Sequence, residues 1–395
     1  MSKKSPQLRF EGFTDDWEER KLGDVFYERS ERSSEGELIS VTINSGVVKA
    51  SELDRKDNSS NDKSNYKKVE VGDIAYNSMR MWQGASGCSS YDGILSPAYT
   101  VIIPKEGTDS KFFAYDFKRH DMIQTFKRNS QGLTSDTWNL KFPTLKSVKV
   151  MVPCMEEQTK ISNFFERLDT TITLHQRKLD LLKEQKKGYL QKMFPKNGAK
   201  VPELRFAGFA DDWEDRKLGE ISKYSNGGSY ENDVVENGTY ELITLKSVNM
   251  SGKLVSSGKF INRETKTLEK DTLVMILSEQ APGLLGMTAQ IPENNKYVLN
   301  QRVAEIKPNT NIDSYFLSMS INRSQVYFSK RGAGTKVQNI SKPNVENFEF
   351  YCPSEREQQK IGSFFKQVDN TIDLHQHKLD LLKEQKKGFL QKMFV

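Results

Sequence analysis

An internal repeat is the feature that most constrains how this chain folds. Residues 8–23 read LRFEGFTDDWEERKLG, and residues 204–219 read LRFAGFADDWEDRKLG, 196 positions later. A second pair of matching segments covers residues 153–194 and 353–394, now 200 positions apart. Since a repeat decides the architecture before any local pattern does, the sequence predicts two copies of one structural unit.

The segments between these matching blocks differ from each other. Residues 24–142 and 220–342 share a faint outline and little sequence. Matching ends indicate a shared scaffold, and divergent middles indicate one fold that recognises two different things. The contrast within this single chain therefore predicts two recognition domains on a common frame.

The matching segment at the end of each copy predicts a long helix with a narrow apolar seam. Side chains recur at alternating steps of four and three residues, which is a heptad pattern. The seam residues are Ile161, Phe165, Leu168, Ile172, His175, Leu179, Leu182, Lys186, Tyr189 and Met193 in the first copy, and Ile361, Phe365, Val368, Ile372, His375, Leu379, Leu382, Lys386, Phe389 and Met393 in the second. The two seam lysines are expected to lay their stems across the seam.

About 38 helical residues make a rod of about 57 Å, which is unstable without a partner helix. The expected partner is the other copy in antiparallel pairing, and the alternative is that each helix packs on its own domain. Ser354 and Glu357 fit a capping box at the second helix start. The first copy has Cys154 in place of Ser354, so its cap is expected to be weaker or different. Trp17 and Trp213, in the repeated blocks, are expected to be packing anchors.

Both middles have the composition of mixed α/β domains. Predicted strands cover 38–43, 68–78 and 98–103 in the first copy, and 240–248, 271–277 and 301–306 in the second. Each copy then has one aromatic-rich helix, at about 110–127 and 313–330. The predicted fold class is α/β (mixed α+β), with two globular recognition domains separated by a long antiparallel two-helix coiled coil and related by an internal pseudo-twofold repeat. The expected boundaries are 1–155 for the first domain, 156–198 for the first helix, 199–354 for the second domain and 355–395 for the second helix.

Basic and polar segments recur at matching places in the two middles. Arg, Lys, Asn, Gln and Ser are the side chains that bind phosphates and read base edges. Candidate DNA-contacting residues in the first copy are Asn77, Ser78, Arg80, Trp82, Gln83, Lys127, Arg128, Asn129, Gln131, Thr134, Ser135, Trp138 and Asn139. Those in the second copy are Ser278, Glu279, Gln280, Asn300, Gln301, Arg302, Lys330, Arg331, Thr335, Lys336 and Gln338. The alternative is an ordinary solvated loop. Against it, a loop of the same kind occurs at the same place in both copies although its amino-acid sequence differs.

Composition limits the class of protein. The net charge of +6 permits a polyanionic partner without requiring one. Three scattered cysteines without a CxxC pair predict a reduced, cytoplasmic protein. There is no run of 18 apolar residues and no apolar N-terminal segment, so neither a membrane span nor a secretion signal is expected.

The sequence lacks the common catalytic motifs. The sequence has no P-loop, no HExxH zinc motif and no GxSxG nucleophile motif. Three of its four histidines lie on the two long predicted helices, which leaves little for general base chemistry. We therefore expect no catalytic site, no bound metal and no cofactor in this chain.

The repeated blocks carry a resemblance that covers the whole chain. The chain resembles the specificity subunit of a type I restriction-modification system. The resemblance lies in WEERKLG at 17–23 and WEDRKLG at 213–219, in the Pro–x3–Glu-Gln–x–Lys-Ile pattern at 153–161 and 353–361, and in KLDLLKEQKKGxLQKMF at 178–194 and 378–394. The arrangement of two copies is more specific than any one of these motifs.

This resemblance implies two target-recognition domains, each reading one half of a split target in double-stranded DNA. It also implies two methyltransferase subunits docked on the helices, which would use S-adenosylmethionine to methylate adenine. Motor-nuclease (restriction) subunits would use ATP and Mg²⁺. A helix of about 57 Å exceeds one DNA turn of roughly 34–36 Å. The helices would thus act as a ruler, and the target would be two short blocks with an unread gap.

Two functions of other classes remain as alternatives. A coiled-coil scaffold without sequence-specific DNA recognition would leave the divergence of the middles unexplained. An enzyme, such as a fused nuclease or methyltransferase, would need acidic metal ligands or a cofactor-binding loop, and neither pattern occurs.

Overall fold

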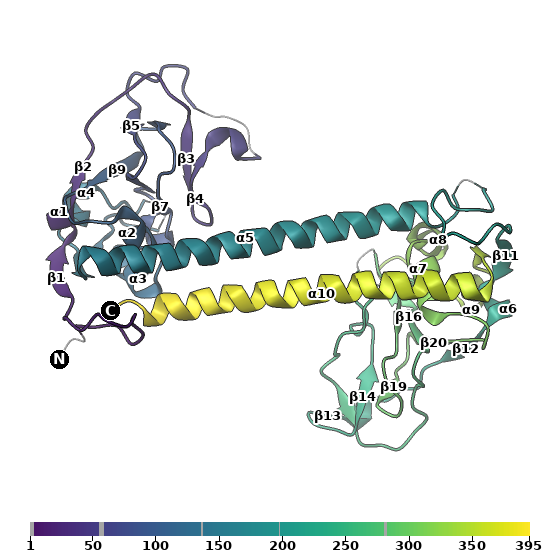
Figure 1. Cartoon of the computed structure of the whole chain (residues 1–395). Helices are drawn as coiled ribbons and strands as arrows, with labels where there is room; N and C mark the ends of the chain where they lie inside the picture. The colour runs from purple at the N-terminus through teal and green to yellow at the C-terminus, as the bar shows by residue number, and fades with distance from the viewer. Residues whose placement is uncertain (1–3, 55–58, 136, 197, 280–282) are drawn as a thin grey trace. The chain divides into compact units, whose positions relative to one another are not determined.

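The computed structural model describes residues 4–54, 59–135, 137–196, 198–279 and 283–395. The chain forms two compact units: unit 1 holds Met1–Arg177 and Gln376–Val395, and unit 2 holds Lys178–His375. Each unit contains one domain and parts of both long helices, α5 (Met155–Lys192) and α10 (Glu355–Lys392), as Figure 1 shows. The units do not follow the four predicted segments, because each domain packs on the start of one helix and the end of the other.

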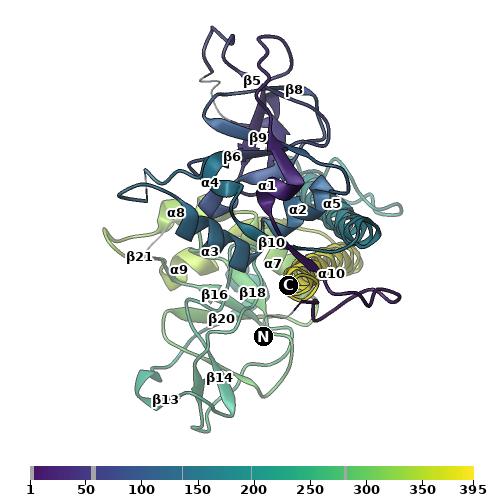
Figure 2. The ribbon, with the colours of Figure 1, turned by 90° about the vertical axis from the view of Figure 1, so that its left-hand side faces the viewer.

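The domain of unit 1 is built on a four-stranded antiparallel sheet. Its order is β2 (Phe26–Glu28), β9 (Tyr99–Pro104), β6 (Ile74–Asn77) and β7 (Ser86–Cys88). The two-stranded ribbons around it pair β1 (Glu18–Lys21) with β10 (Lys149–Val152), β3 (Ile39–Thr42) with β4 (Gly46–Lys49), and β5 (Lys67–Val69) with β8 (Gly93–Leu95). Figure 2, in which unit 1 faces the viewer, shows β5 and β8 at the end of this domain away from α10.

Short helices complete this domain. They are α1 (Leu22–Val25), α2 (Ser110–Asp116), α3 (His120–Asn129) and α4 (Phe142–Leu145), with the 3₁₀ turns η1 (Ala50–Glu52) and η2 (Met81–Gln83). The prediction of one helix over 110–127 is wrong, since it is divided into α2 and α3. The backbone N–H groups of Lys118 and Arg119 donate three residues back, to Tyr115 and Asp116, which tightens and ends α2. The Asp116 carboxylate, which is buried, then accepts from Nε of Arg119 at 2.7 Å.

Unit 2 repeats the central sheet and differs around it. The sheet order is β12 (Ser222–Asn226), β20 (Val303–Pro308), β16 (Leu273–Ile276) and β18 (Thr288–Gln290). A second sheet has the order β13 (Val234–Val235), β15 (Phe260–Ile261), β14 (Tyr240–Ile243) and β19 (Tyr297–Leu299), and β14 is parallel to β19. The remaining strand pairs are β11 (Glu214–Lys217) with β22 (Glu349–Cys352) and β17 (Ser278–Glu279) with β21 (Gln338–Asn339).

The helices of this second domain follow the order of the first. They are α6 (Leu218–Ile221), α7 (Ser314–Asn322), α8 (Gln325–Arg331) and α9 (Lys342–Glu346), with the 3₁₀ turn η3 (Glu231–Asp233). The helix predicted over 313–330 is again two helices. The N–H of Ser324 donates three residues back to Ile321, where α7 ends.

Four of the six strand predictions are confirmed; the strand predicted over 240–248 ends at Ile243, where β14 ends, and one further segment is divided. The segment 68–78 is two strands, β5 and β6, rather than one. Gly72 lies at φ 93° between them, and the N–H of Asp73 donates back to the carbonyl of Glu70 to close a turn. A left-handed conformation of this kind favours glycine, which ends the strand.

The repeated tryptophans are buried packing anchors, as predicted. The ring of Trp17 lies edge-on to Phe112 of α2 (5.7 Å between ring centroids) and to Phe394, just after α10 (6.3 Å). The matching rings in unit 2 are Trp213, Phe316 and Phe194. Each tryptophan therefore joins its domain to the end of the helix from the other copy.

The two long helices begin with the same ion pair. Arg9 donates from Nε and Nη2 to the two carboxylate oxygens of Glu157 at 2.8 Å, and Arg205 does the same to Glu357 at 2.7 Å. The capping box predicted at Ser354 is wrong, because Arg205 occupies the Glu357 carboxylate. The expected difference between the two helix starts is wrong for the same reason.

A tyrosine, an aspartate and a lysine join three elements in each unit. In unit 1, Asp169 of α5 accepts from Nζ of Lys386 in α10 at 2.5 Å and from the hydroxyl of Tyr115 in α2 at 2.9 Å. Burial and the Asp169 carboxylate raise the pKa of Tyr115, so the phenol stays protonated as a donor. The matching residues in unit 2 are Asp369 of α10, Lys186 of α5 and Tyr315 of α7. The seam lysines thus end on aspartates of the facing helix.

The helix segments in each unit run antiparallel. In unit 1, Phe164 packs on Phe389 (5.0 Å between ring centroids), whereas Asp169, farther along α5, binds Lys386, which is earlier in α10. In unit 2, Tyr189 packs on Phe364 (5.1 Å) and Lys186 binds Asp369. The predicted antiparallel pairing therefore holds within each unit.

The two aspartates differ in burial, and this predicts unequal effects on stability. The side chain of Asp369 is 7% exposed and that of Asp169 is 39% exposed. Asp369→Ala leaves the half-buried Lys186 without its carboxylate, so we expect a loss of about 3 kcal/mol in the free energy of unfolding. Asp169→Ala should cost about 1 kcal/mol or less, because solvent screens that pair. Urea unfolding followed by circular dichroism measures both.

Glu184→Ala is the matched control for this comparison. Glu184 is exposed on α5 and lies 3.9 Å from Lys187, so its loss should not change the unfolding midpoint. Equal losses for Asp369→Ala and Asp169→Ala would contradict the argument from burial.

Candidate nucleic-acid interface

The candidate residues of the first domain come from three segments that the fold brings together. These segments are η2 and the residues before it, the end of α3, and residues 130–140. The N–H of Leu140 donates to the carbonyl of Ser78 at 2.8 Å, which joins the third segment to the first. Gln131 and Asn139 exchange backbone hydrogen bonds at 2.9 and 2.8 Å. The ends of the basic loop are therefore paired with each other and anchored to the residue that follows β6.

Two indole rings and a lysine meet where these segments join. Trp82 of η2 lies edge-on to Trp138 of the hairpin, with 5.2 Å between ring centroids. Nζ of Lys127, in the last turn of α3, lies 5.5 Å from the centroid of the Trp138 ring. An ammonium beside an indole is held by the ring quadrupole. Aromatic rings next to a cation suit the stacking of bases and the neutralisation of phosphate.

Lys118, which the sequence analysis missed, holds two loops beside this surface together. Nζ of Lys118 donates to the carbonyl oxygens of Ile43 at 2.9 Å and Gly84 at 2.5 Å. Burial, with a smaller contribution from the charge of Lys386, lowers the pKa of Lys118 to about 8. Lys118 thus joins the turn between β3 and β4 to the end of η2. In an aromatic-rich helical segment, no sequence pattern marks such a residue.

The second domain repeats the construction with different residues. The N–H of Ile340 donates to the carbonyl of Leu277 at 3.0 Å, and Ala333 and Asn339 exchange backbone hydrogen bonds at 2.9 Å. These contacts match Leu140 with Ser78 and Gln131 with Asn139 in the first domain. The N–H of Leu277 also donates to the carbonyl of Arg302 at 3.0 Å. The segments that contain residues 301–302, 278 and 330–338 therefore lie on neighbouring strands and loops.

Three candidate side chains are buried and bonded inside their domains. The hydroxyls of Ser78 and Thr100 are hydrogen-bonded at 2.7 Å, and Oγ of Ser278 donates to Oδ1 of Asn339. One carboxylate oxygen of Glu279 accepts from three successive backbone N–H groups, those of residues 283–285. These side chains hold the loops in place and do not face solvent, so direct contact of Ser78, Ser278 or Glu279 with DNA is not supported. Gln280 lies outside the described residues.

The remaining candidates of both domains have side chains at the surface, apart from Asn300. The exposed ones are Arg80, Lys127, Arg128, Gln131, Thr134, Ser135, Gln301, Arg302, Lys330, Arg331, Thr335 and Lys336. The half-buried ones are Asn77, Trp82, Gln83, Asn129, Trp138, Asn139 and Gln338. The side-chain oxygen of Asn139 is buried without a hydrogen-bond partner. Each domain thus presents cations and amides along one set of joined loops, which is the chemistry that binds phosphates and base edges.

A carboxylate that the sequence analysis missed lies within the second set. Oε1 of Glu231 in η3 accepts from Nε2 of Gln301 at 2.7 Å and from Nδ2 of Asn300 at 3.1 Å. These hydrogen bonds, with that of Gln301 the strongest, lower the pKa of Glu231 to about 2. The carboxylate is therefore ionised throughout the neutral range.

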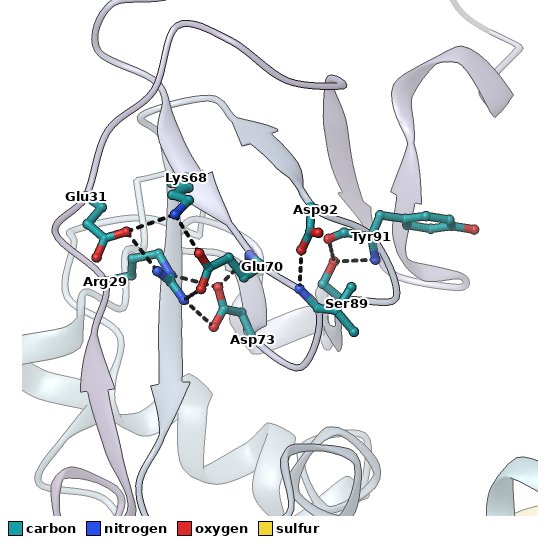
Figure 3. A network of polar contacts seen from close by, with 9 residues as sticks. Arg29, Glu31, Lys68, Glu70, Asp73, Ser89, Tyr91 and Asp92 are labelled. Atoms are coloured by element: carbon teal, nitrogen blue, oxygen red, sulfur yellow. Dashed lines mark hydrogen bonds and ion pairs between the residues drawn. The ribbon is translucent and has the colours of Figure 1, made fainter.

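The interiors of the two domains differ beside these loops. In the first domain the buried guanidinium of Arg29 binds Asp73 at 2.8 Å, Glu70 at 2.8 Å and Glu31 at 3.0 Å, and Lys68 binds Glu70 (Figure 3). Figure 3 shows these side chains converging from neighbouring strands and turns. β12 pairs with β20 in the second domain as β2 pairs with β9 in the first. In this comparison the residue that matches Arg29 is Ser225. The Arg29 network therefore has no counterpart at that position of the second domain, where Glu305 opposite Ser225 binds Lys266 at 2.7 Å instead.

Across the described ranges, no three His, Cys, Asp or Glu side chains are grouped so that they could hold a metal ion. In the same part of the chain, no helix combines the length and the apolar character needed to cross a membrane.

Comparison with protein families gives a match in each copy. Residues 14–184 and 210–384 match the family model described as the type I restriction modification DNA specificity domain. The chain is 21% identical over 332 residues to the type I restriction enzyme MjaVIII specificity subunit of Methanocaldococcus jannaschii, covering 78% of this chain and 76% of that protein. It is 24% identical over 309 residues to the MjaIX specificity subunit of the same organism, covering 74% and 70%.

Solved structures share the fold. The type I restriction-modification S subunit from M. genitalium is 15% identical, with a TM-score of 0.65 and coverage of 99% of each chain. A chain from a study of complex assembly and conformational transition of the type I R-M system is 16% identical, with a TM-score of 0.53 and coverage of 96% and 97%. At these identities the likeness concerns the fold alone.

Proposed function

This chain belongs to the type I restriction-modification DNA specificity family, and from that premise we propose that each of its domains reads one half of a split DNA target. The observation that carries the proposal is the joined loop construction of the two domains. Its backbone contacts match in the two copies, whereas the side chains it presents differ. One fold with two different polar surfaces is what recognition of two different half-sites requires.

The helices are proposed as the ruler and as the docking site for methyltransferase subunits. Each helix exposes two leucines seven residues apart: Leu174 (59% exposed) and Leu181 (51%) in α5, and Leu374 (67%) and Leu381 (50%) in α10. Seven residues are about two helical turns, so each pair lies on one face of its helix. Exposed apolar side chains that recur in this way are typical of a protein-binding surface.

The chemistry is assigned to partner subunits. In this proposal the chain is not an enzyme and acts in the cytoplasm on double-stranded DNA. Two methyltransferase subunits would hold S-adenosylmethionine, and restriction subunits would hold ATP and Mg²⁺. The basic loops would supply phosphate contacts, and the exposed amides would supply base contacts.

The test of this function is a map of methylated bases. The chain is expressed with its cognate methyltransferase subunit, and methylated adenines are located genome-wide. We expect one target of two short blocks separated by a gap of fixed length. Methylation without a split target would contradict the two-domain assignment, and the absence of sequence-specific DNA retention would favour the scaffold alternative.

Salt dependence tests the phosphate contacts. If Arg128 and Lys336 each neutralise one phosphate, then Arg128→Ala or Lys336→Ala should reduce the slope of log affinity against log salt by about 0.9. Lys223→Ala is the matched control, since Lys223 is exposed on β12 outside the candidate loops. A fluorescence titration of the complex with target duplex at several salt concentrations measures the slope. An unchanged slope would remove that residue from the DNA-contacting surface.

The symmetry of the ion pairs predicts the behaviour of half a chain. Residues 178–188 and 378–388 are identical. A second copy of a 1–200 fragment can therefore offer its Lys186 to Asp169, in place of Lys386 in unit 1. The fragment should dimerise through its helices, because an unpaired seam would leave mostly apolar side chains in water. Sedimentation measures the oligomeric state.

Charge reversal in the fragment is the control. Lys186→Glu places a carboxylate opposite Asp169 at two symmetric positions and should weaken the dimer. With methyltransferase added, the dimer should modify a palindromic target built from two copies of the first half-site. A folded monomer would contradict the pairing, and a non-palindromic target would contradict the assignment of one half-site to each domain.

A further inference from the structure

The turn between β19 and β20 presents one exposed amide that is fixed by a carboxylate. Gln301 is exposed, and its Nε2 donates to Oε1 of Glu231 at 2.7 Å. The following residue, Arg302, lies at φ 65°, a left-handed conformation that turns the chain sharply into β20. The carbonyl of Arg302 accepts from the N–H of Leu277 at 3.0 Å, which anchors the turn to the neighbouring strand segment.

The carboxylate of Glu231 is itself held in place. Asn300, only 6% exposed, donates from Nδ2 to Oε1 at 3.1 Å, and Ser229 donates from Oγ to Oε2 at 3.0 Å. The backbone of Asn300 is fixed by its own N–H, which donates to the carbonyl of Ile243 at 3.0 Å. Glu231 is thus a fixed acceptor beside a turn of defined geometry, and Gln301 is the exposed amide that it holds.

A carboxylate decides which way an amide faces. An ionised carboxylate only accepts hydrogen bonds, so the nitrogen of the Gln301 amide must point toward Glu231. One N–H is used in that contact. The second N–H and the carbonyl oxygen remain for another partner. Their positions relative to each other are fixed, because the amide cannot flip. A donor beside an acceptor in one plane is the arrangement that pairs with N7 and N6 of adenine in the major groove.

The surroundings of Gln301 suit a nucleic acid. Gln301 lines a surface hollow of about 340 Å³ together with Lys246, Lys259 and Arg302. These three cations offer charge for backbone phosphates, and Thr244 and Ser257 in the same hollow offer hydroxyls. When β9 is aligned with β20, the position of Gln301 is occupied by Pro97 in the first domain, so that position offers no side-chain amide there.

We propose that Gln301 reads an adenine in the half-site of the second domain, and that Glu231 is the positioning residue that orients its amide. This proposal rests on the proposed function, since it names the base class that one residue of the second domain recognises. Glu231 does not touch DNA in this role. It removes the flipped amide orientation, in which the Gln301 oxygen would face adenine N7 and repel it.

The test uses the full chain in complex with its methyltransferase subunit. Once the split target is mapped, methylation rates are measured on duplexes in which each base pair of the second half-site is replaced in turn. The variants are Gln301→Ala, Glu231→Gln and the control Glu236→Gln, which removes the same charge from an exposed neighbouring position. A glutamine at 231 can donate or accept, so it tolerates both orientations of the Gln301 amide.

The expected result is a loss of discrimination at one position. The wild-type complex should require an A·T pair at that position by roughly tenfold or more. Gln301→Ala and Glu231→Gln should both reduce this ratio toward one there, while discrimination elsewhere in both half-sites and with Glu236→Gln stays unchanged. If Glu231 had a purely structural role, Glu231→Gln would not affect the same single base pair as Gln301→Ala.

Two outcomes overturn the proposal. One is that Glu231→Gln keeps full discrimination at every position, and the other is that it lowers discrimination equally across the second half-site. Failure of the proposed function is distinguishable from both, because then the wild-type complex itself would show no split target. Reading of the first half-site serves as the internal measure that each variant is folded and assembled.

Discussion

The ion pair between an aspartate of one long helix and a lysine of the other is the interaction on which each unit depends. Asp169 takes its lysine from the second copy, and Asp369 takes its lysine from the first. Each aspartate also accepts from a tyrosine of the adjoining domain, so one carboxylate holds a domain helix and both long helices. Loss of the lysine partner is strongly unfavourable for the buried Asp369 and weaker for the more exposed Asp169, but in both units the partner comes from the other copy. This explains why the repeated segments are those at the ends of each copy.

The frame leaves the rest of each domain free to differ. The Trp17 cluster, the Arg9–Glu157 pair and the β1–β10 ribbon all lie where the domain meets the helices. Beyond the central sheet the two domains diverge in their interiors as well as at their surfaces. Arg29 is buried among three carboxylates in the first domain, whereas the matching residue in the second is Ser225. A new recognition surface is therefore accompanied by new internal support.

The sequence was sufficient where periodicity or repetition carried the information. The heptad seam, the buried tryptophans and most strands follow from patterns within a few residues. It failed where a contact distant in sequence decides the outcome. No pattern near Ser354 shows that Arg205, far away in the chain, occupies Glu357. Likewise nothing around 110–127 shows that Arg119 closes a turn on a buried Asp116 while Lys118 leaves the helix to bind Ile43 and Gly84.

The same limit applies to recognition. Candidate base-reading residues can be proposed from polar loops, but the orientation of an amide is set by its neighbours, and these come from elsewhere in the fold. Glu231 lies 70 positions before Gln301 and belongs to a different element. Because Ser229 and Asn300 fix Glu231 in turn, a substitution in η3 can change what the β19–β20 turn presents without altering the turn itself. Specificity in a domain of this kind is thus a property of the loops together with the groups elsewhere in the domain that orient them. Substitution of the loop residues alone would leave the base-reading side chains without the groups that orient them. Exchange of the whole divergent segment between the repeated blocks transfers the base-reading residues together with those groups.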